Sequence, residues 1–280
     1  MSEVLLDIEN LSVHFQTIHG TVEAIRGISF TLGREKLGIV GESGSGKSMT
    51  ARAILKLTPP NAQVSADRMH FQEIDLLRAS EARMLKIRGE RISMILQDPK
   101  FSLNPVVKVG EQIAEAYRVH HQATARSARS RTLAMLEAVQ IRDPGRVYNL
   151  YPHEISGGMG QRVMIAMMLI PEPAIIIADE PTSALDVTVR LEVLSILDQL
   201  IENRGIGLVF ISHDLNLVRR FCDRVLIMYA GRIVEELPAA ALERAEHPYT
   251  QGLLQSLPRI HERRDRLPVL DRDPAWLGRL

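Results

Sequence analysis

A glycine-rich stretch that ends in Gly-Lys-Ser carries the clearest chemistry of the sequence. It occupies residues 41–48, between an apolar run at 37–40 and a helical pattern at 49–55. Its glycines allow the backbone to turn N–H groups inward, and the following helix adds the positive end of its dipole. In such a loop the lysine reaches the β- and γ-phosphates, and the serine hydroxyl is offered to Mg²⁺. A flexible Gly/Ser linker, the alternative, does not explain the Lys-Ser ending. We therefore predict a triphosphate cradle formed by Gly41, Glu42, Ser43, Gly44, Ser45, Gly46, Lys47, Ser48 and Met49.

Two carboxylates end a second apolar run, at 174–178. Asp179, at the tip of this predicted strand, is expected to hold Mg²⁺ directly or through water. Glu180 is expected to face the water that attacks the γ-phosphate. A strand that carries Asp-Glu by chance is the alternative interpretation, and the phosphate loop in the same chain weighs against it.

Gln97 and His213 follow two further predicted strands, at 91–96 and 208–211. In an open α/β sheet ligands bind at the carboxyl ends of the strands. The Gln97 amide is therefore a candidate to reach the metal ion or the attacking water. His213 is a candidate to bond the γ-phosphate and to position the water of Glu180. A glutamine that caps a loop and a structural histidine are the plain alternatives.

Two more segments are candidate contacts. Ser156, Gly157 and Gly158 precede the apolar helical pattern at 163–169, and a Ser-Gly-Gly helix start offers N–H groups and a hydroxyl to an anion. By itself, Ser-Gly-Gly is also an ordinary turn. Phe15 ends an amphipathic strand pattern, where a ring can stack on a purine or belong to the core.

The order of the remaining patterns predicts an α/β fold. Runs 4–15 and 22–30 alternate between apolar and polar residues, as in antiparallel strands with one wet face. Residues 109–150 carry helical patterns without a strand pattern, and Asp143-Pro144-Gly145 is expected to end the second of these helices. A helix is expected at 187–202, with a core stripe of Leu191, Leu194, Leu197 and Ile201, followed by a hairpin at 224–235.

Composition limits the classes of function. The chain has 280 residues and a formal net charge of zero, so no global field favours nucleic acid or anionic lipid. The start lacks the pattern of a secretory signal, and the apolar segment 163–178 is interrupted by Pro171 and Pro173. We therefore expect any membrane attachment to go through a partner. The single cysteine, Cys222, excludes an internal disulfide.

The combination of these motifs resembles the ATPase subunits of ABC transporters. Details resemble the ATPases of dipeptide and oligopeptide importers, which have nickel-importing relatives. These details are Leu96-Gln97-Asp98-Pro99, Ser102-Leu103-Asn104-Pro105, Gln161-Arg162-Val163-Met164-Ile165-Ala166-Met167 and His247-Pro248-Tyr249-Thr250. The resemblance implies a P-loop NTPase (RecA-like) core with an N-terminal antiparallel β-subdomain and an α-helical subdomain inserted at about 100–160. It places a nucleotide-binding domain at 1–237 and a C-terminal tail at 238–280.

The same resemblance implies partners and roles. Two ATPase subunits, identical or different, would close head to tail, so that Ser156, Gly157 and Gly158 of one complete the triphosphate site of the other. Asp186 would be a further nucleotide-binding residue. ATP and Mg²⁺ would be bound, Phe15 would stack on adenine and Glu180 would act as general base. Two membrane permeases would receive the movement at the cytoplasmic face of the cell (inner) membrane, with an extracytoplasmic solute-binding protein supplying the solute and no nucleic acid involved.

Three residue patterns depart from those of the family. Ile155 and Met159 replace the Leu and Gln of the commonest signature, Met49 replaces a hydroxyl residue, and residues 259–280 lack the cysteines of an iron–sulfur extension.

Other functions are disfavoured by the sequence. A soluble ABC ATPase acting on nucleic acid or ribosomes would normally show two cassettes, long coiled coils or zinc ligands, which this sequence lacks. A non-hydrolysing switch is disfavoured by Glu180 and His213, and a GTPase by the lack of an Asn-Lys-x-Asp segment.

Overall fold

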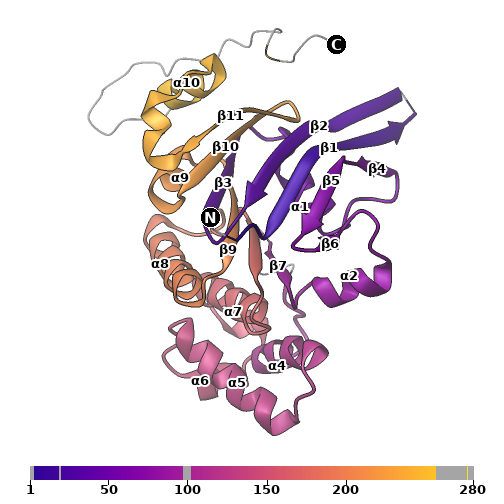
Figure 1. The fold of residues 1–280 in the computed structure, drawn as a ribbon. Helices are drawn as coiled ribbons and strands as arrows, with labels where there is room; N and C mark the ends of the chain where they lie inside the picture. The colour runs from indigo at the N-terminus through magenta and orange to yellow at the C-terminus, as the bar shows by residue number, and fades with distance from the viewer. Residues whose placement is uncertain (1–2, 19, 97–101, 257–275, 277–280) are drawn as a thin grey trace. The chain divides into compact units, whose positions relative to one another are not determined.

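The computed structural model describes residues 3–18, 20–96, 102–256 and 276 (Figure 1). The chain forms two compact units. Unit 1 combines Met1–Arg78 with Phe210–Leu280, and unit 2 comprises Ala79–Val209. The predicted division at residue 237 stays a prediction.

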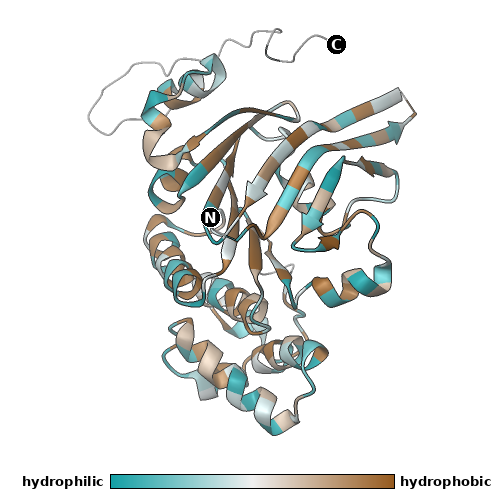
Figure 2. Ribbon diagram, in the orientation of Figure 1, coloured by the Kyte–Doolittle hydropathy of each residue, from teal (hydrophilic) through white to brown (hydrophobic). Residues whose placement is uncertain are grey.

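An antiparallel sheet forms the N-terminal part of unit 1. Its strands are β1 (Leu6–Thr17), β2 (Gly20–Leu32), β4 (Ala62–Ser65), β5 (Arg68–Phe71) and β6 (Ile74–Asp75), in the order β2-β1-β5-β6 with β4 also on β1. The antiparallel pairing of the first two strands is therefore confirmed. Bands of hydrophilic and hydrophobic residues alternate along β1 and β2, as expected for a sheet with one buried face (Figure 2).

A second group of strands in unit 1 carries the phosphate loop. The strand β3 (Lys36–Val40) pairs in parallel with β10 (Arg224–Tyr229), which pairs antiparallel with β11 (Arg232–Pro238). The predicted C-terminal hairpin is thus confirmed. Helices α1 (Lys47–Ile54), α9 (Leu215–Phe221) and α10 (Pro248–Gln255) and the 3₁₀ helix η2 (Ala239–Arg244) complete this unit.

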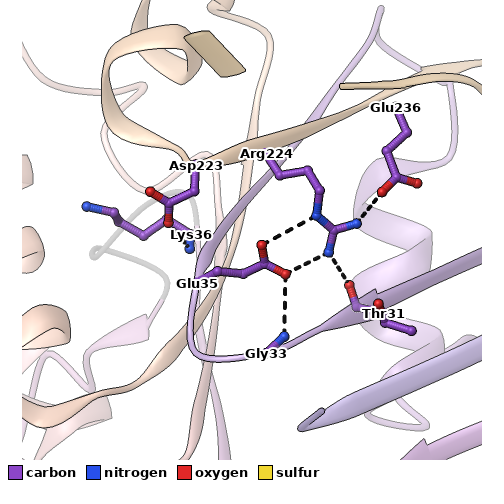
Figure 3. A network of polar contacts seen from close by, with 7 residues as sticks. All are labelled: Thr31, Gly33, Glu35, Lys36, Asp223, Arg224 and Glu236. Carbon is purple, nitrogen blue, oxygen red and sulfur yellow. Dashed lines mark hydrogen bonds and ion pairs between the residues drawn. The ribbon is translucent and has the colours of Figure 1, made fainter. Parts of the chain in front are cut away.

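Arg224 connects distant segments of unit 1 through a polar network (Figure 3). Its guanidinium donates to the Thr31 carbonyl at 2.5 Å and to the Glu35 carboxylate at 2.7 Å, and it also pairs with Glu236. Burial by itself lowers the pKa of Arg224, but the hydrogen bonds that it donates to the carboxylates of Glu35 and Glu236 outweigh this effect and raise the pKa. The network therefore holds a permanently charged guanidinium between β2, β10 and β11.

Unit 2 contains buried parallel strands and most of the helices. The strands β7 (Ile92–Ile95) and β8 (Ile175–Asp179) pair in parallel. Its helices are α2 (Glu81–Ile87), α4 (Val109–His120), α5 (Ala125–Ala138), α6 (Pro144–Tyr148), the 3₁₀ helix η1 (Pro152–Glu154), α7 (Gly157–Leu169) and α8 (Val187–Arg204). The strand β9 (Gly207–Ser212) passes from unit 2 into unit 1.

Two expectations for unit 2 are corrected. Asp143-Pro144-Gly145 begins a helix and does not end one, because α5 ends at Ala138, the Asp143 carboxylate accepts the Arg146 N–H at 3.0 Å and Pro144 begins α6. Leu191 does not belong to the core stripe, because it is 56% exposed, whereas Leu194, Leu197 and Ile201 are buried. The predicted helix start at Ser156-Gly157-Gly158 is confirmed, because α7 begins at Gly157. Among the described residues, no helix is both long and apolar enough to span a membrane.

Candidate nucleotide site

The phosphate loop is shaped by close backbone contacts within unit 1. A Cβ on Gly41 would lie 2.1 Å from the Met228 carbonyl oxygen, so only glycine fits against β10. Gly44 and Gly46 have φ values of 82° and 104°, which residues with a side chain rarely adopt. Gly46 also leads directly into α1. The loop therefore has the backbone form that turns N–H groups toward an anion at a helix start.

The Lys47 side chain is held by the loop itself. Its ammonium donates to the carbonyls of Gly41 at 2.8 Å and Glu42 at 2.7 Å, and the residue is buried. The Ser45 N–H donates to the Glu42 carbonyl, and the Ser45 carbonyl accepts the Gly231 N–H at 3.0 Å. These bonds join both halves of the loop to each other and to the turn after β10.

The other predicted loop residues are available to a ligand. Ser43 and Gly44 are exposed, and Ser48 and Met49 are half-buried in the first turn of α1. No acidic residue occupies that turn, so the positive end of the helix is not neutralised. The geometry fits a phosphate chain together with a divalent cation.

Phe15 and His213 also lie in unit 1. Phe15 is half-buried near the end of β1 and pairs with Val22 of β2 and Ala62 of β4. The Phe15 ring is therefore partly accessible, and a role in stacking on adenine requires such access. His213 is exposed in the turn between β9 and α9, where the Asp214 carboxylate caps α9 by accepting the Leu217 N–H at 3.0 Å.

In unit 2, Ser156 caps the helix α7. Its hydroxyl accepts the Met159 N–H at 3.3 Å, and the first turn of α7 holds no acidic residue. Ser156 and Gly157 are exposed. These two residues line a cavity of about 710 Å³ together with Asp186 and Val189 of the α8 start. The segment predicted to bind an anion is thus a capped, solvent-accessible helix N-terminus.

The two signature glycines differ in their surroundings. A Cβ on Gly158 would lie 2.6 Å from Val189 Cγ1, so this glycine allows α7 to approach α8 closely. A Cβ on Gly157 would have only Leu185 within reach, at 4.0 Å. Contacts within the chain therefore explain glycine at 158 but not at 157.

Asp179 and Glu180 lie at the end of β8 in unit 2, as predicted. Asp179 is buried and Glu180 is half-buried. Glu180 has a φ of 47°, a conformation uncommon for a residue with a side chain, and such strain is typical of functional positions. The Ser183 N–H and hydroxyl both donate to the Glu180 carbonyl, at 3.3 and 3.2 Å.

Asp186 has a structural contact of its own. Its carboxylate accepts the Val189 N–H at 3.0 Å and so caps α8. Its predicted role toward the nucleotide stays a prediction. Gln97 lies outside the described residues.

Two residues with contacts to the site were not among the predicted site residues. Gln161 of α7 is buried, and its amide donates to the carbonyl of Pro181, next to Glu180. Tyr249 of α10 accepts the Glu42 N–H of the phosphate loop at 3.1 Å. Both residues fall within motifs that carry the family resemblance, but no spacing rule links either one to its partner.

Comparison with known proteins identifies the family. Residues 25–183 match the family model described as ABC transporter. The chain belongs to the ABC transporter family. It is 45% identical over 278 residues to the dipeptide transport ATP-binding protein DppD of Bacillus subtilis (strain 168), covering 98% of this chain and 83% of DppD. It is 43% identical to the oligopeptide transport ATP-binding protein OppD of Haemophilus influenzae, covering 98% and 85%.

Solved structures agree with this ABC transporter assignment. The dimeric bacterial ABC transporter cassette MJ0796 has a TM-score of 0.74 at 26% identity, over 84% of this chain and 98% of that one. The same cassette, solved in a post-hydrolysis state with ADP and Pi, gives 0.72 at 27% identity, with the same coverage. The predicted P-loop NTPase fold and ABC-type ATPase activity are therefore confirmed.

Proposed function

We propose that this ABC ATPase is the energy-coupling subunit of an importer of di- or oligopeptides. The observation that carries the proposal is the 45% identity to a dipeptide transport ATP-binding protein across 98% of the chain. The phosphate loop of unit 1 and the carboxylate pair of unit 2 supply the parts that ATP hydrolysis requires.

Each residue of the proposed ATP site has a role in hydrolysis. The loop N–H groups and Lys47 bind the β- and γ-phosphates, and Phe15 stacks on adenine. Ser48, Gln97 and Asp179 would hold Mg²⁺, which neutralises phosphate charge when bound. Glu180 accepts a proton from the attacking water, and His213 positions that water.

Gly157 supports a head-to-tail pair of cassettes. Because none of the described residues requires glycine there, the missing side chain is explained by the approach of a group from outside. A triphosphate held by the loop of a second ATPase subunit, identical or different, fits the exposed N-terminus of α7. The predicted dimer would thus have a site that neither copy completes alone.

A hollow in unit 2 supports docking of a permease. It has a volume of about 290 Å³ and is lined in part by Asn104, Val107, Val119 and Met167. Val119 is 70% exposed, and the nearby Val106 is 78% exposed. An apolar rim beside α4 suits a short helix of a membrane permease, so that two ATPase subunits would receive two permeases, and it supports the expected location at the cytoplasmic face of the inner membrane.

Solute uptake tests the proposal directly. Cells of the source organism that lack this gene should lose uptake of labelled dipeptides and tripeptides and should keep uptake of ⁶³Ni²⁺. The wild-type gene should restore peptide uptake. Loss of nickel uptake with normal peptide uptake would instead assign the chain to a nickel importer, and unchanged uptake of both would reject the proposal.

Glu180→Gln provides the matched inactive form. The amide keeps the size of the side chain but cannot take a proton, so hydrolysis should fall by roughly 10²–10⁴ while ATP binding persists. Glu172→Gln is the control, because Glu172 also has a positive φ, of 62°, and lies in unit 2. Equal ATPase rates in the two variants would remove Glu180 from the role of general base.

A further inference from the structure

The first peptide group of the phosphate loop is held from both of its sides. The Gly41 carbonyl and the Glu42 N–H belong to one planar unit. The carbonyl accepts the Lys47 ammonium at 2.8 Å. The N–H donates to the hydroxyl of Tyr249 at 3.1 Å. The orientation of this peptide group therefore links Tyr249 to the lysine that binds phosphate.

Tyr249 comes from a distant part of the chain and is itself firmly placed. It follows residue 42 by 207 positions and is fully buried. Its ring contacts Tyr229, at the end of β10, with centroids 4.5 Å apart. The Trp276 ring packs against the rings of both tyrosines, at 5.9 and 6.0 Å. The hydroxyl is thus presented by a packed aromatic cluster formed by Tyr229, Tyr249 and Trp276.

Hydrogen bonds at the start of α10 fix the position of the Tyr249 ring. The Glu235 carboxylate of β11 accepts the N–H groups of Glu246 at 2.6 Å and His247 at 3.3 Å. The His247 Nδ1 then accepts the Tyr249 N–H at 3.2 Å and caps the helix. Figure 1 shows α10 and β11 as neighbouring parts of unit 1. Tyr249 is therefore held at both its backbone and its ring.

We propose that Tyr249 is a positioning residue for the phosphate loop. By fixing the orientation of the Gly41–Glu42 peptide group, Tyr249 sets the affinity of the loop for nucleotide. The inference rests on the proposed ATP site and adds to it a residue from α10. Without the hydroxyl, the Glu42 N–H loses this hydrogen bond, and the loss is costly for a donor that is partly shielded from water. The peptide group then turns to find water, and the Gly41 carbonyl moves away from Lys47.

The substitution Tyr249→Phe tests this proposal, because it removes one oxygen and keeps the packed ring. We expect the dissociation constants of ATP and ADP to rise about three- to tenfold, since both nucleotides use the loop. KM for ATP should rise more than kcat falls. Hydrogen exchange at the Glu42 amide should become faster. Tyr229→Phe is the matched control, since it removes a hydroxyl from the same cluster without touching the loop, and its nucleotide affinity should equal that of the wild type.

The outcomes separate positioning from mere stabilisation. A Tyr249→Phe protein that unfolds at a lower temperature but binds ATP and ADP with wild-type affinity would overturn the proposal. Unchanged exchange at the Glu42 amide would overturn it as well. If the wild-type protein itself bound no ATP in the same titration, the proposed ATP site would fail instead, and peptide uptake tests that function independently.

Discussion

Gly157 and Gly158 are adjacent in sequence, yet they meet different requirements. Gly158 makes room for Val189, and its Cβ would lie only 2.6 Å from that side chain. Gly157 has open space beside it and lies exposed at the start of α7. One glycine therefore serves the fold, and the other is available to serve contact with a second cassette.

Alanine at each position should separate these two roles. Gly158→Ala should lower the free energy of unfolding by about 1–3 kcal/mol, because the side chain overpacks the contact between α7 and α8. Gly157→Ala should unfold like the wild type but should lose ATP-dependent dimerisation, measured by size exclusion in the Glu180→Gln background. A Gly157→Ala protein that dimerises with ATP as its parent does would contradict the head-to-tail site.

The phosphate loop could be predicted residue by residue, since its chemistry is contiguous. Strand, turn, lysine and helix lie within residues 36–54, and local backbone rules suffice to interpret them. The bond between Tyr249 and Glu42 joins residues 207 positions apart, so no pattern in a single sequence indicates it. The parts of the site formed by neighbouring residues could thus be predicted from the sequence. The contacts that depend on tertiary packing could not.

Helix boundaries were less predictable for a related reason. Asp143 and Pro144 suit the end of one helix as well as the cap and first residue of the next, and the structure uses them to begin α6. The helix α2 begins at Glu81, and its N-cap Ser80 accepts the Arg83 N–H with its hydroxyl. Leu191 fits the helical period of the core but lies on the open side of α8. Periodicity identified the longer helices α4, α5 and α8 but not α6, and it did not fix helix ends or the buried face of α8.

The end of α4 carries a histidine, His120, whose pKa is lowered by burial. His120 packs against Gly89, where a Cβ would lie 2.5 Å from the imidazole Nε2. Burial lowers the pKa of His120, Glu90 opposes this shift, and the neighbouring His121 adds to it. The unfolded chain therefore binds this proton more readily than the folded one.

Acid should consequently weaken the fold through His120. The contribution of His120 to the free energy of unfolding is complete above the ordinary histidine pKa. It is lost as the pH falls through the lowered pKa of His120 in the folded protein. The midpoint of thermal unfolding should thus drop less between pH 7.5 and 5.5 in His120→Gln than in the wild type. His153→Gln, at an exposed histidine of the same unit, is the control. Identical pH dependence in wild type and His120→Gln would show that another group is responsible.

The Arg224 network holds unit 1 together across the length of the chain. Arg224 and Glu35 are 189 positions apart, yet their side chains form two hydrogen bonds. The Arg224 side chain is 21% exposed, whereas Arg68, which pairs with Asp7, is 51% exposed. Solvent screens the second pair far more than the first.

Removing each arginine should reveal this difference. Arg224→Met should cost about 2 kcal/mol of unfolding free energy, because charge-assisted bonds to Glu35, Glu236 and Thr31 are lost together. Arg68→Met should cost less than about 1 kcal/mol. Urea titration measures both values. Equal losses would show that the network of Figure 3 adds nothing beyond a surface ion pair.

The pairing of β3 with β10 also has a consequence for biosynthesis. The edge of β3 that pairs with β10 leaves the ribosome long before its partner is made. At about 5–20 residues per second, the wait is on the order of 10 to 40 s. During that interval the Gly41 turn lacks the carbonyl of Met228 that constrains it. A nascent polypeptide of this protein thus acquires a finished nucleotide cradle only after β10 has been made, and until then it relies on the cell to keep an uncovered strand from aggregating.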